Sequence, residues 1–285
     1  MYAYVTLVML GDEYVKGAVV LAKSLLLTNT RYDLVCMVTK DVSSVGVSLL
    51  HQYFNYVIPV DYITYNCPPM ITKRQNQMYG GWINNAFTKW QCLTLKNYKK
   101  IVYLDADHVV VKNIDHLFFL PAPALCFADD GHGYYYNKLV GRDVVTPKNI
   151  ESFFRYNKIL CRAGTVLLEP SNDLLDSIRR QLNNKNNILR RCLYHNGFDE
   201  QVLLQAFMEQ KMCVTQLCIL YAWNAGSYHK LRKSFEPYII NYYGDEKPWH
   251  YSINKPVKYM DVFIWKYFNA YDIDIKFKNC KQTVQ

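Results

Sequence analysis

Short apolar runs alternate with amphipathic segments along the first third of the chain. The strand-like runs, rich in β-forming side chains, are residues 2–10, 34–38, 56–60 and 101–104. The helix-like segments, with apolar residues at spacings of three and four, are residues 14–26, 45–54 and 87–95. Strands separated by helices are typical of βαβ units. We therefore predict an α/β protein with a mainly parallel central sheet flanked by helices.

The remainder of the chain is predicted to belong to the same domain. Residues 165–169 form another strand, and a helix follows with Ser171 or Asn172 as its cap. Because no repeat or linker interrupts the chain, we expect one domain over residues 1–265 and an appendage over residues 266–285. Three segments lack periodicity, and loops of this length are usually functional lids or disordered. These segments are residues 63–86, 128–160 and 183–197.

The composition indicates a globular protein with an anionic partner. Hydrophobic residues make up 51% of the 285 residues and charged residues 20%, which excludes a mostly disordered or fibrous chain. Lys and Arg number 33 against 24 Asp and Glu, so the net charge is +9. Basic pairs such as Lys99-Lys100 lack a nucleic-acid recognition motif around them, and we expect no nucleic-acid partner.

The location of the protein is predicted from its apolar runs and its cysteines. The run from Gly17 to Ala22 is bounded by Lys16 and Lys23, far short of the roughly 20 residues that a spanning helix needs. Residues 1–10 lack the basic start and small-residue cleavage site of a signal peptide. The nine cysteines show no CxxC spacing, which favours free thiols. We expect a cytoplasmic protein without a membrane span.

Two carboxylates directly follow the strand at residues 101–104. Asp105 and Asp107 lie two residues apart, so both side chains can reach one ion. Carboxylates at the end of a buried strand are costly unless a positive charge meets them. A hard divalent cation, Mn²⁺ or Mg²⁺, would suit them. The alternative is that the two residues cap a helix or pair with lysines.

Five blocks of the sequence, in order, resemble glycosyltransferase family 8, the retaining enzymes of the glycogenin and galactinol-synthase type. The blocks are YVTLVMLGDEYVKGAVVLAKSL, FTKWQCLTLKNYKKIVYLDADHVVVKNIDHLFFLP, CRAGTVLLEPS, DEQVLLQAF and GDEKPWHY. Together they extend over about residues 3–251. The resemblance implies a Rossmann-like GT-A fold, a UDP-sugar donor carrying glucose or galactose, Mn²⁺ (or Mg²⁺), and transfer with retention at the anomeric carbon.

The same resemblance assigns positions of this chain to the donor. They are Thr6, Leu7, Val8, Tyr14, Lys89, Asp105, Ala106, Arg162, Ala163, Gly244 and Lys247. By resemblance, the three residues from Thr6 line the uridine pocket and Tyr14 stacks on the base. Asp105 lies near the ribose, and Lys89 reaches the sugar or phosphate. Gly244 lets the backbone approach the diphosphate, which Lys247 neutralises.

The resemblance also assigns the metal and the reacting centre. The implied metal ligands are Asp105, Asp107 and Asn241. Glu200 and Gln201 would face the transferred sugar, with Asp199 as the third catalytic candidate.

The sequence departs from the family pattern at three places. Asn241 stands where the family has a histidine ligand, and an amide oxygen adds less affinity than an imidazole for a softer ion. His250 is close in sequence, but nothing in the sequence shows that it substitutes. Arg162 replaces a neutral asparagine in the sugar-binding block, and the loop VMLGDE is one residue longer than in glycogenin.

The leading prediction is a metal-dependent retaining hexosyltransferase, and the alternative is a degenerate relative that binds a nucleotide sugar or a glycan without turnover. The acceptor, whether protein, glycan or small polyol, is left open, as is a homodimer. We expect residues 63–86, 128–160 and 183–199 to form the acceptor side. The abundance of Asn, Lys and Tyr would suit an AT-rich genome, such as that of a large insect virus with a glycogenin-like protein.

Overall fold

An eight-stranded sheet divides the molecule into two helical layers. The computed structural model describes residues 1–70, 72–127, 141–155, 161–184, 198–227, 236–244, 246–252 and 256–273. The strand order is β3-β2-β1-β4-β8-β6-β9-β7. In that order the strands are Tyr56–Pro59, Asp33–Val38, Tyr2–Val8, Lys100–Leu104, Cys161–Leu168, Ala124–Phe127, Val214–Gln216 and Val144–Val145.

The first four strands of this order are parallel to one another. β1 pairs with β2 from Ala3 opposite Asp33 to Val8 opposite Val38, and it pairs with β4 on its other side. β8 runs antiparallel to both β4 and β6, and β9 is parallel to β6. The prediction of an α/β fold with a mainly parallel sheet is confirmed.

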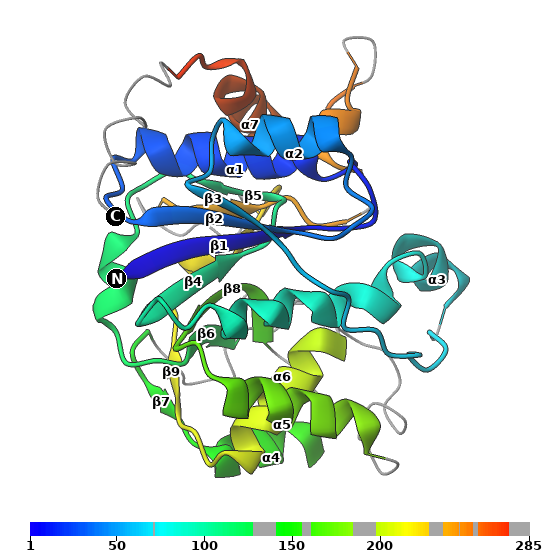
Figure 1. Cartoon of the computed structure of the whole chain (residues 1–285), viewed down its shortest axis with the longest axis vertical. Coiled ribbons are helices and arrows are strands. Elements are labelled where there is room, and N and C mark those ends of the chain that lie inside the picture. The colour runs from blue at the N-terminus through cyan, green and yellow to red at the C-terminus, as the bar shows by residue number, and fades with distance from the viewer. Residues whose placement is uncertain are drawn as a thin grey trace.

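Helices cover both faces of the sheet (Figure 1). α1 (Val15–Leu27) and α2 (Ser44–His51) lie on one face, together with α7 (Asp261–Ala270). The other face carries the 3₁₀ helix η1 (Ile83–Thr94), α4 (Pro147–Arg155), α5 (Asn172–Asn183) and α6 (Phe198–Glu209). Each face has its own hydrophobic core, because successive strand residues point to opposite sides.

A second, three-stranded sheet holds the C-terminal part of the chain against α1. Its order is β10 (Trp223–Asn224), β11 (Ile239–Asn241) and β5 (His108–Val110). Val20 of α1, Val109 of β5 and Trp265 of α7 belong to one buried cluster between these elements. The predicted boundary at residue 265 falls within α7, and the division into a domain and an appendage stays a prediction.

The sequence predicted α1, α2 and α5 but did not predict α3 (Lys73–Tyr79), α4, α6 or α7. Ser171 caps α5 by accepting a hydrogen bond from the Leu174 backbone N–H, which agrees with one of the two predicted caps. The expectation that residues 63–86 lack regular structure was wrong at α3, where Thr72 and Gln75 form a capping box. It was also wrong at α4, which lies within the segment 128–160. The rest of that segment, residues 128–140 and 156–160, lies outside the described residues.

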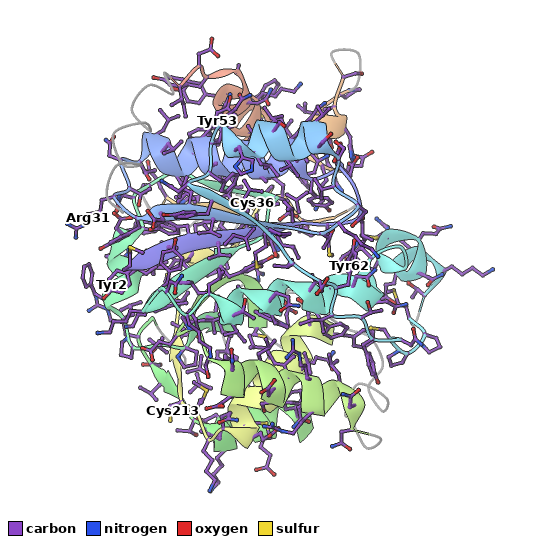
Figure 2. The ribbon with its side chains drawn as sticks, viewed as in Figure 1. Tyr2, Arg31, Cys36, Tyr53, Tyr62 and Cys213 are labelled. Atoms are coloured by element: carbon purple, nitrogen blue, oxygen red, sulfur yellow. The ribbon has the colours of Figure 1, made fainter. Side chains whose placement is uncertain are left out.

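Short helices and connections complete the fold. They are η2 (Asp115–Phe119), η4 (Ile219–Tyr221) and η6 (Pro248–His250). The cysteines that the structure describes are all free thiols, and Cys36, Cys92 and Cys126 are buried. Figure 2 shows Cys36 within the sheet layer and Cys213 near the periphery. None of the helices in the described ranges is long and apolar enough to cross a membrane.

α1 approaches the end of β4 very closely at Gly17. A Cβ atom built on Gly17 would lie 2.5 Å from the Ala106 carbonyl oxygen and 2.9 Å from ring atoms of Trp249. The absence of a side chain at this one position therefore allows α1 to pack over the turn that carries Asp105 and Asp107.

Replacing Gly17 by alanine should therefore destabilise the protein. We expect Gly17→Ala to lower the free energy of unfolding by about 1–3 kcal/mol, because the added methyl group must displace backbone or a packed indole. Urea unfolding followed by circular dichroism measures this change. Gly81→Ala is the matched control, since nothing lies within 4 Å of a Cβ there. It should be neutral or slightly stabilising, and equal losses in both variants would contradict the close approach.

Candidate active site

The candidate site lies where β4 ends, at the carboxyl edge of the parallel strands. Asp105 follows β4 directly, and Asp107 precedes β5. The Asp105 backbone N–H donates to the Gly164 carbonyl of β8 at 2.9 Å, so the neighbouring strand closes one side of the site. Ligands of open α/β sheets bind at this edge.

Lys89 joins the first carboxylate to α6. Its Nζ lies 2.8 Å from Asp199 Oδ2 and 3.3 Å from Asp105 Oδ1. The Trp90 indole donates to the Asp199 carbonyl at 3.2 Å, which fixes the start of α6 against η1. Burial alone would lower the pKa of Lys89, but Asp105 and Asp199 outweigh it and hold that pKa well above its usual value. Three residues predicted for the site are thus brought together.

Lys247 meets the second carboxylate from the C-terminal part of the chain. Its Nζ donates to Asp107 Oδ2 at 2.6 Å and to the Tyr242 carbonyl at 2.9 Å. Burial would raise the pKa of Asp107, but the attraction of Lys247 and a hydrogen bond with His108 hold it well below its usual range. Burial opposes the charge on Lys247 too, and Asp107 keeps the pKa of that lysine raised.

Tyr14 lies beside this pair. Lys247 Nζ is 5.7 Å from the centre of the Tyr14 ring, a cation–π distance. Burial raises the pKa of the Tyr14 hydroxyl to about 12, and the opposing attraction of Lys247 only partly offsets it. Trp249 packs edge-on against the same ring, with 5.3 Å between centroids. The structure therefore places Tyr14 within the site, between α1 and the segment of Lys247.

The sequence analysis missed His108 as a possible metal ligand. Asp105, Asp107 and His108 each offer one ligand atom, and these atoms lie within 4.8 Å of one another. Two carboxylate oxygens and one imidazole nitrogen form a set that Mn²⁺ accepts, so the residues fit the ion that the fold family implies. The signal in the sequence was a histidine directly after the Asp-Ala-Asp block. The sequence analysis assigned this histidine no role.

Asn241 lies directly across from His108. The two residues are Cα partners in the antiparallel pairing of β11 with β5. The Asn241 side-chain amide donates to the Asn224 Oδ1 at 3.3 Å. The predicted ligand Asn241 is therefore near the carboxylates, and its role at a metal stays a prediction.

Two residues predicted for the reacting centre lie near the start of α6. Glu200 Oε1 accepts a hydrogen bond from the Ala163 backbone N–H at 2.9 Å. Gln201 is completely buried, and neither its amide oxygen nor its amide nitrogen has a hydrogen-bond partner in the part of the chain that the structure describes. A buried amide without partners costs about 1–3 kcal/mol, which a ligand could recover.

Arg162 and Gly244, both predicted to contact the donor, lie in the described part of the chain. The Arg162 Nη1 atom donates to the Ala222 carbonyl at 2.6 Å, so the guanidinium is anchored on the segment before β10. Gly244 has a φ of +97°, a left-handed conformation that glycine adopts without strain.

Residues of β1 face both cores. Leu7 belongs to the cluster under η1, and Val8 belongs to the cluster under α1. Thr6 is buried, and its hydroxyl has no partner among the described residues. Ala106 is also buried beneath α1. The contribution of these residues to a nucleotide pocket stays a prediction.

Glu13 was not recognised in the sequence as part of the site. Its Oε1 accepts a hydrogen bond from Trp249 Nε1 at 2.9 Å and contacts His250 Nε2. Burial would raise the pKa of Glu13, but the hydrogen bonds from His250 and Trp249, together with the charges of His250 and Lys16, hold it below its usual value. The loop after β1 is thereby tied to the Lys247 segment, a long-range contact that no local sequence pattern indicates.

Comparison with known families gives a match over most of the chain. The model of Glycosyl transferase family 8 matches residues 5–252. An uncharacterized protein of Acanthamoeba polyphaga mimivirus is 33% identical over 255 residues, covering 87% of this chain and 83% of that protein. Glycogenin-1 of Caenorhabditis elegans is 26% identical over 258 residues, and these cover 87% of this chain but only 51% of the relative.

Solved structures show the same fold. The galactosyltransferase LgtC, in a complex with donor and acceptor sugar analogs, has a TM-score of 0.59 and 12% identity, and the match covers 97% of this chain and 99% of LgtC. The glycosyltransferase GlyE of Streptococcus pneumoniae has a TM-score of 0.57 and 15% identity, over 97% of this chain and 61% of GlyE. The predicted GT-A fold is confirmed.

The Lys247–Asp107 pair predicts a pH-dependent loss of stability. Asp107→Asn should lower the free energy of unfolding by about 3–5 kcal/mol near neutral pH, because Lys247 loses the charge that compensates its burial. The lowered pKa of Asp107 means that the pair stabilises the protein fully above the unfolded-state pKa of about 3.9. This stabilisation is lost as the pH falls toward the folded-state pKa.

Urea unfolding of Asp107→Asn and the unchanged protein across a pH series measures this difference. The difference should be constant between about pH 5 and 8 and should shrink below about pH 4. Asp176→Asn is the matched control, because its pair with Arg179 at 3.2 Å is exposed. It should cost less than about 1 kcal/mol. A difference for Asp107→Asn that grows toward low pH would contradict the assigned pairing.

Proposed function

Because the chain belongs to glycosyltransferase family 8, we propose that it is a metal-dependent retaining hexosyltransferase that uses UDP-glucose or UDP-galactose. The observation that supports this most directly is the cluster of possible ligand atoms after β4, where those of Asp105, Asp107 and His108 lie within 4.8 Å of one another. Each of the two aspartates is also met by a buried lysine, as the alternative from the sequence expected, and these lysines add positive charge to the site. Such a set of charges suits an ion, a diphosphate and a sugar in adjacent positions.

The residues that would hold the ion are Asp105 and Asp107, with a third ligand from the β5–β11 pair. Asn241 is the third ligand that the family resemblance implies. A bound divalent cation would stabilise the negative charge that develops on the leaving diphosphate. Mn²⁺ or Mg²⁺ would suit the carboxylate oxygens.

Lys247 and Lys89 supply the positive charge of the chain itself. Lys247 would turn from Asp107 to the donor diphosphate, and Gly244 would let the backbone come close to the same phosphates. Lys89 is held by Asp105 and Asp199, so its ammonium group is fixed in place before a donor arrives. Fixed charges need no reorganisation when the leaving group departs.

The reacting centre is proposed at the start of α6. Loss of the diphosphate leaves positive charge on the sugar, which a carboxylate or an amide oxygen can stabilise. Glu200 is oriented by the Ala163 N–H, and Gln201 has an amide oxygen without a partner among the described residues. Asp199 is bound to Lys89 and would act mainly by positioning that lysine.

The donor nucleotide is proposed to lie over the end of β1. Thr6, Leu7 and Val8 would border the uridine, Tyr14 would stack on the base, and Ala106 would line the turn beneath it. Arg162 and Ala163 would lie toward the sugar. We propose a protein, glycan or small polyol as the acceptor and a cytoplasmic location.

Release of UDP tests this function. Purified protein is incubated with UDP-glucose or UDP-galactose and Mn²⁺, Mg²⁺ or EDTA, with water, glucans, polyols and the protein itself as acceptors. We expect release of UDP that requires the metal and is lost in Asp107→Ala but kept in Asp176→Ala. No metal-dependent release with any donor would contradict the enzyme. Thermal stabilisation by UDP without turnover would favour the alternative, a degenerate binding protein.

The unpartnered amide of Gln201 predicts opposite changes in stability and activity. Gln201→Met keeps the side-chain volume and removes both unpaired polar atoms, so the free energy of unfolding should stay unchanged or rise by about 1–3 kcal/mol. The rate of UDP release should fall by roughly 10²-fold, as when an oriented polar group is removed from a reacting centre.

Gln91→Met is the matched control for stability. The Gln91 amide is also buried but donates to the Asp61 carbonyl at 3.0 Å, so this variant should lose about 1 kcal/mol. A marked loss of stability in Gln201→Met, or full activity, would contradict a role for the Gln201 amide at the reacting centre.

A further inference from the structure

α7 is apolar on the side that faces solvent as well as on the side that faces the protein. Its buried side carries Val262, Trp265 and Phe268. Its exposed side carries Met260, Phe263, Ile264, Tyr267 and Tyr271. A helix that is hydrophobic all round is normally buried all round. The exposed side of α7 is therefore suited to a second partner.

The five exposed residues form one continuous stripe, which we call the α7 face. They lie at Met260 and three, four, seven and eleven residues after it, so they fall on one side of the helix. Their exposed fractions range from 36% for Ile264 to 67% for Met260. The rings of Tyr267 and Tyr271 lie 5.8 Å apart, which continues the stripe to the end of the helix. Single exposed apolar residues are ordinary, whereas a contiguous group marks an interaction surface.

α7 is held firmly against α1, on the outer side of that helix (Figure 1). Lys23 of α1 donates to the carbonyl oxygens of Asn269 and Tyr271, each at 2.9 Å, and so satisfies carbonyls at the end of α7. At the start of the helix, Asp261 Oδ2 accepts a hydrogen bond from the Gly226 backbone N–H at 2.7 Å. Because both ends are tied to other elements, the α7 face is presented by a fixed helix.

The charges that border the α7 face are positive. Lys258, just before the helix, and Lys266, on its flank, lie beside aromatic rings. The single carboxylate within residues 256–271 is Asp261, which is buried. Asp272 follows the stripe and attracts the lysine of α1 that caps α7. The α7 face is thus an apolar surface with cations at its margin and no exposed carboxylate within it.

An anionic lipid surface fits this face better than a second copy of the chain. In a two-fold dimer the face would meet itself, so lysines would approach lysines with no exposed carboxylate of the helix between them. Anionic headgroups offer the opposite charge to both lysines. Aromatic and aliphatic side chains suit the boundary between headgroups and acyl chains. The net charge of +9 also favours approach to an anionic surface.

We propose that the α7 face docks the protein on an anionic lipid membrane, with α7 lying along the surface. The apolar side chains of the face would enter the boundary between headgroups and acyl chains. The two tyrosine hydroxyls would remain among the headgroups, and Lys258 and Lys266 would meet the lipid phosphates. This inference does not depend on the proposed transfer reaction, because no residue of the α7 face belongs to the candidate active site.

Sedimentation with lipid vesicles tests the proposal. The full chain is mixed with vesicles of phosphatidylcholine, with or without phosphatidylserine, and the bound fraction is measured after centrifugation. We expect binding to the vesicles that contain phosphatidylserine, and this binding should weaken as the salt concentration rises. Phe263→Ser and Tyr267→Ser should each lower the apparent affinity by at least about tenfold. Lys266→Gln should lower it by about fivefold.

Phe119→Ser is the matched control. Phe119 is an exposed phenylalanine of η2, outside the α7 face, so this variant should bind vesicles like the unchanged protein. Circular dichroism and urea unfolding establish that the variants remain folded, as expected for changes at exposed positions. Absence of vesicle binding, equal binding to both kinds of vesicle, or equal binding by Phe263→Ser and Phe119→Ser would overturn the proposal.

Sedimentation velocity without lipid distinguishes the other occupant. We expect the protein to show no association that depends on the α7 face. A dimer that Phe263→Ser dissociates, in a protein that does not bind the vesicles, would assign the face to a second copy of the chain and overturn the lipid surface.

Discussion

Two aspartates at the end of a buried strand set the constraint on which the rest of this structure depends. Asp105 and Asp107 cannot remain charged beside the core without compensation. Compensation comes from Lys89 on η1 and from Lys247 near the C-terminus, which are brought together only by the complete fold. The helical layer that includes η1 and the small sheet packed against α1 therefore meet at the same two carboxylates.

Close packing around these charges requires glycine at two positions. Gly17 lets α1 approach the turn at Ala106, and the missing side chain of Gly164 makes room for the His108 ring and the Asp105 carboxylate. Neither glycine has a positive φ, so space and not backbone conformation requires the missing side chain. The Glu13 contacts with Trp249 and His250 then hold the Lys247 segment over the same turn.

The sequence predicted the parts of the site that depend on strand order. Asp105 and Asp107 could be placed because an apolar strand leads directly into them, and Lys247 because its block resembles a known family. Glu13 and His108 could not be placed in this way. Glu13 contacts His250, which lies 237 residues further along the chain. His108 contacts the adjacent Asp107, and only the residue that faces it across the small sheet depends on how distant strands pair. The Asn241–His108 pairing is such a case, since β5 and β11 are far apart in sequence.

The charge pairs also bear on how ligands would bind. Lys247 neutralises Asp107, and a cation that approaches this carboxylate must compete with the lysine. A diphosphate would offer Lys247 new oxygen partners and so release Asp107 for the ion. Ion and nucleotide would then bind more tightly together than either alone, because each removes the cost that the other meets.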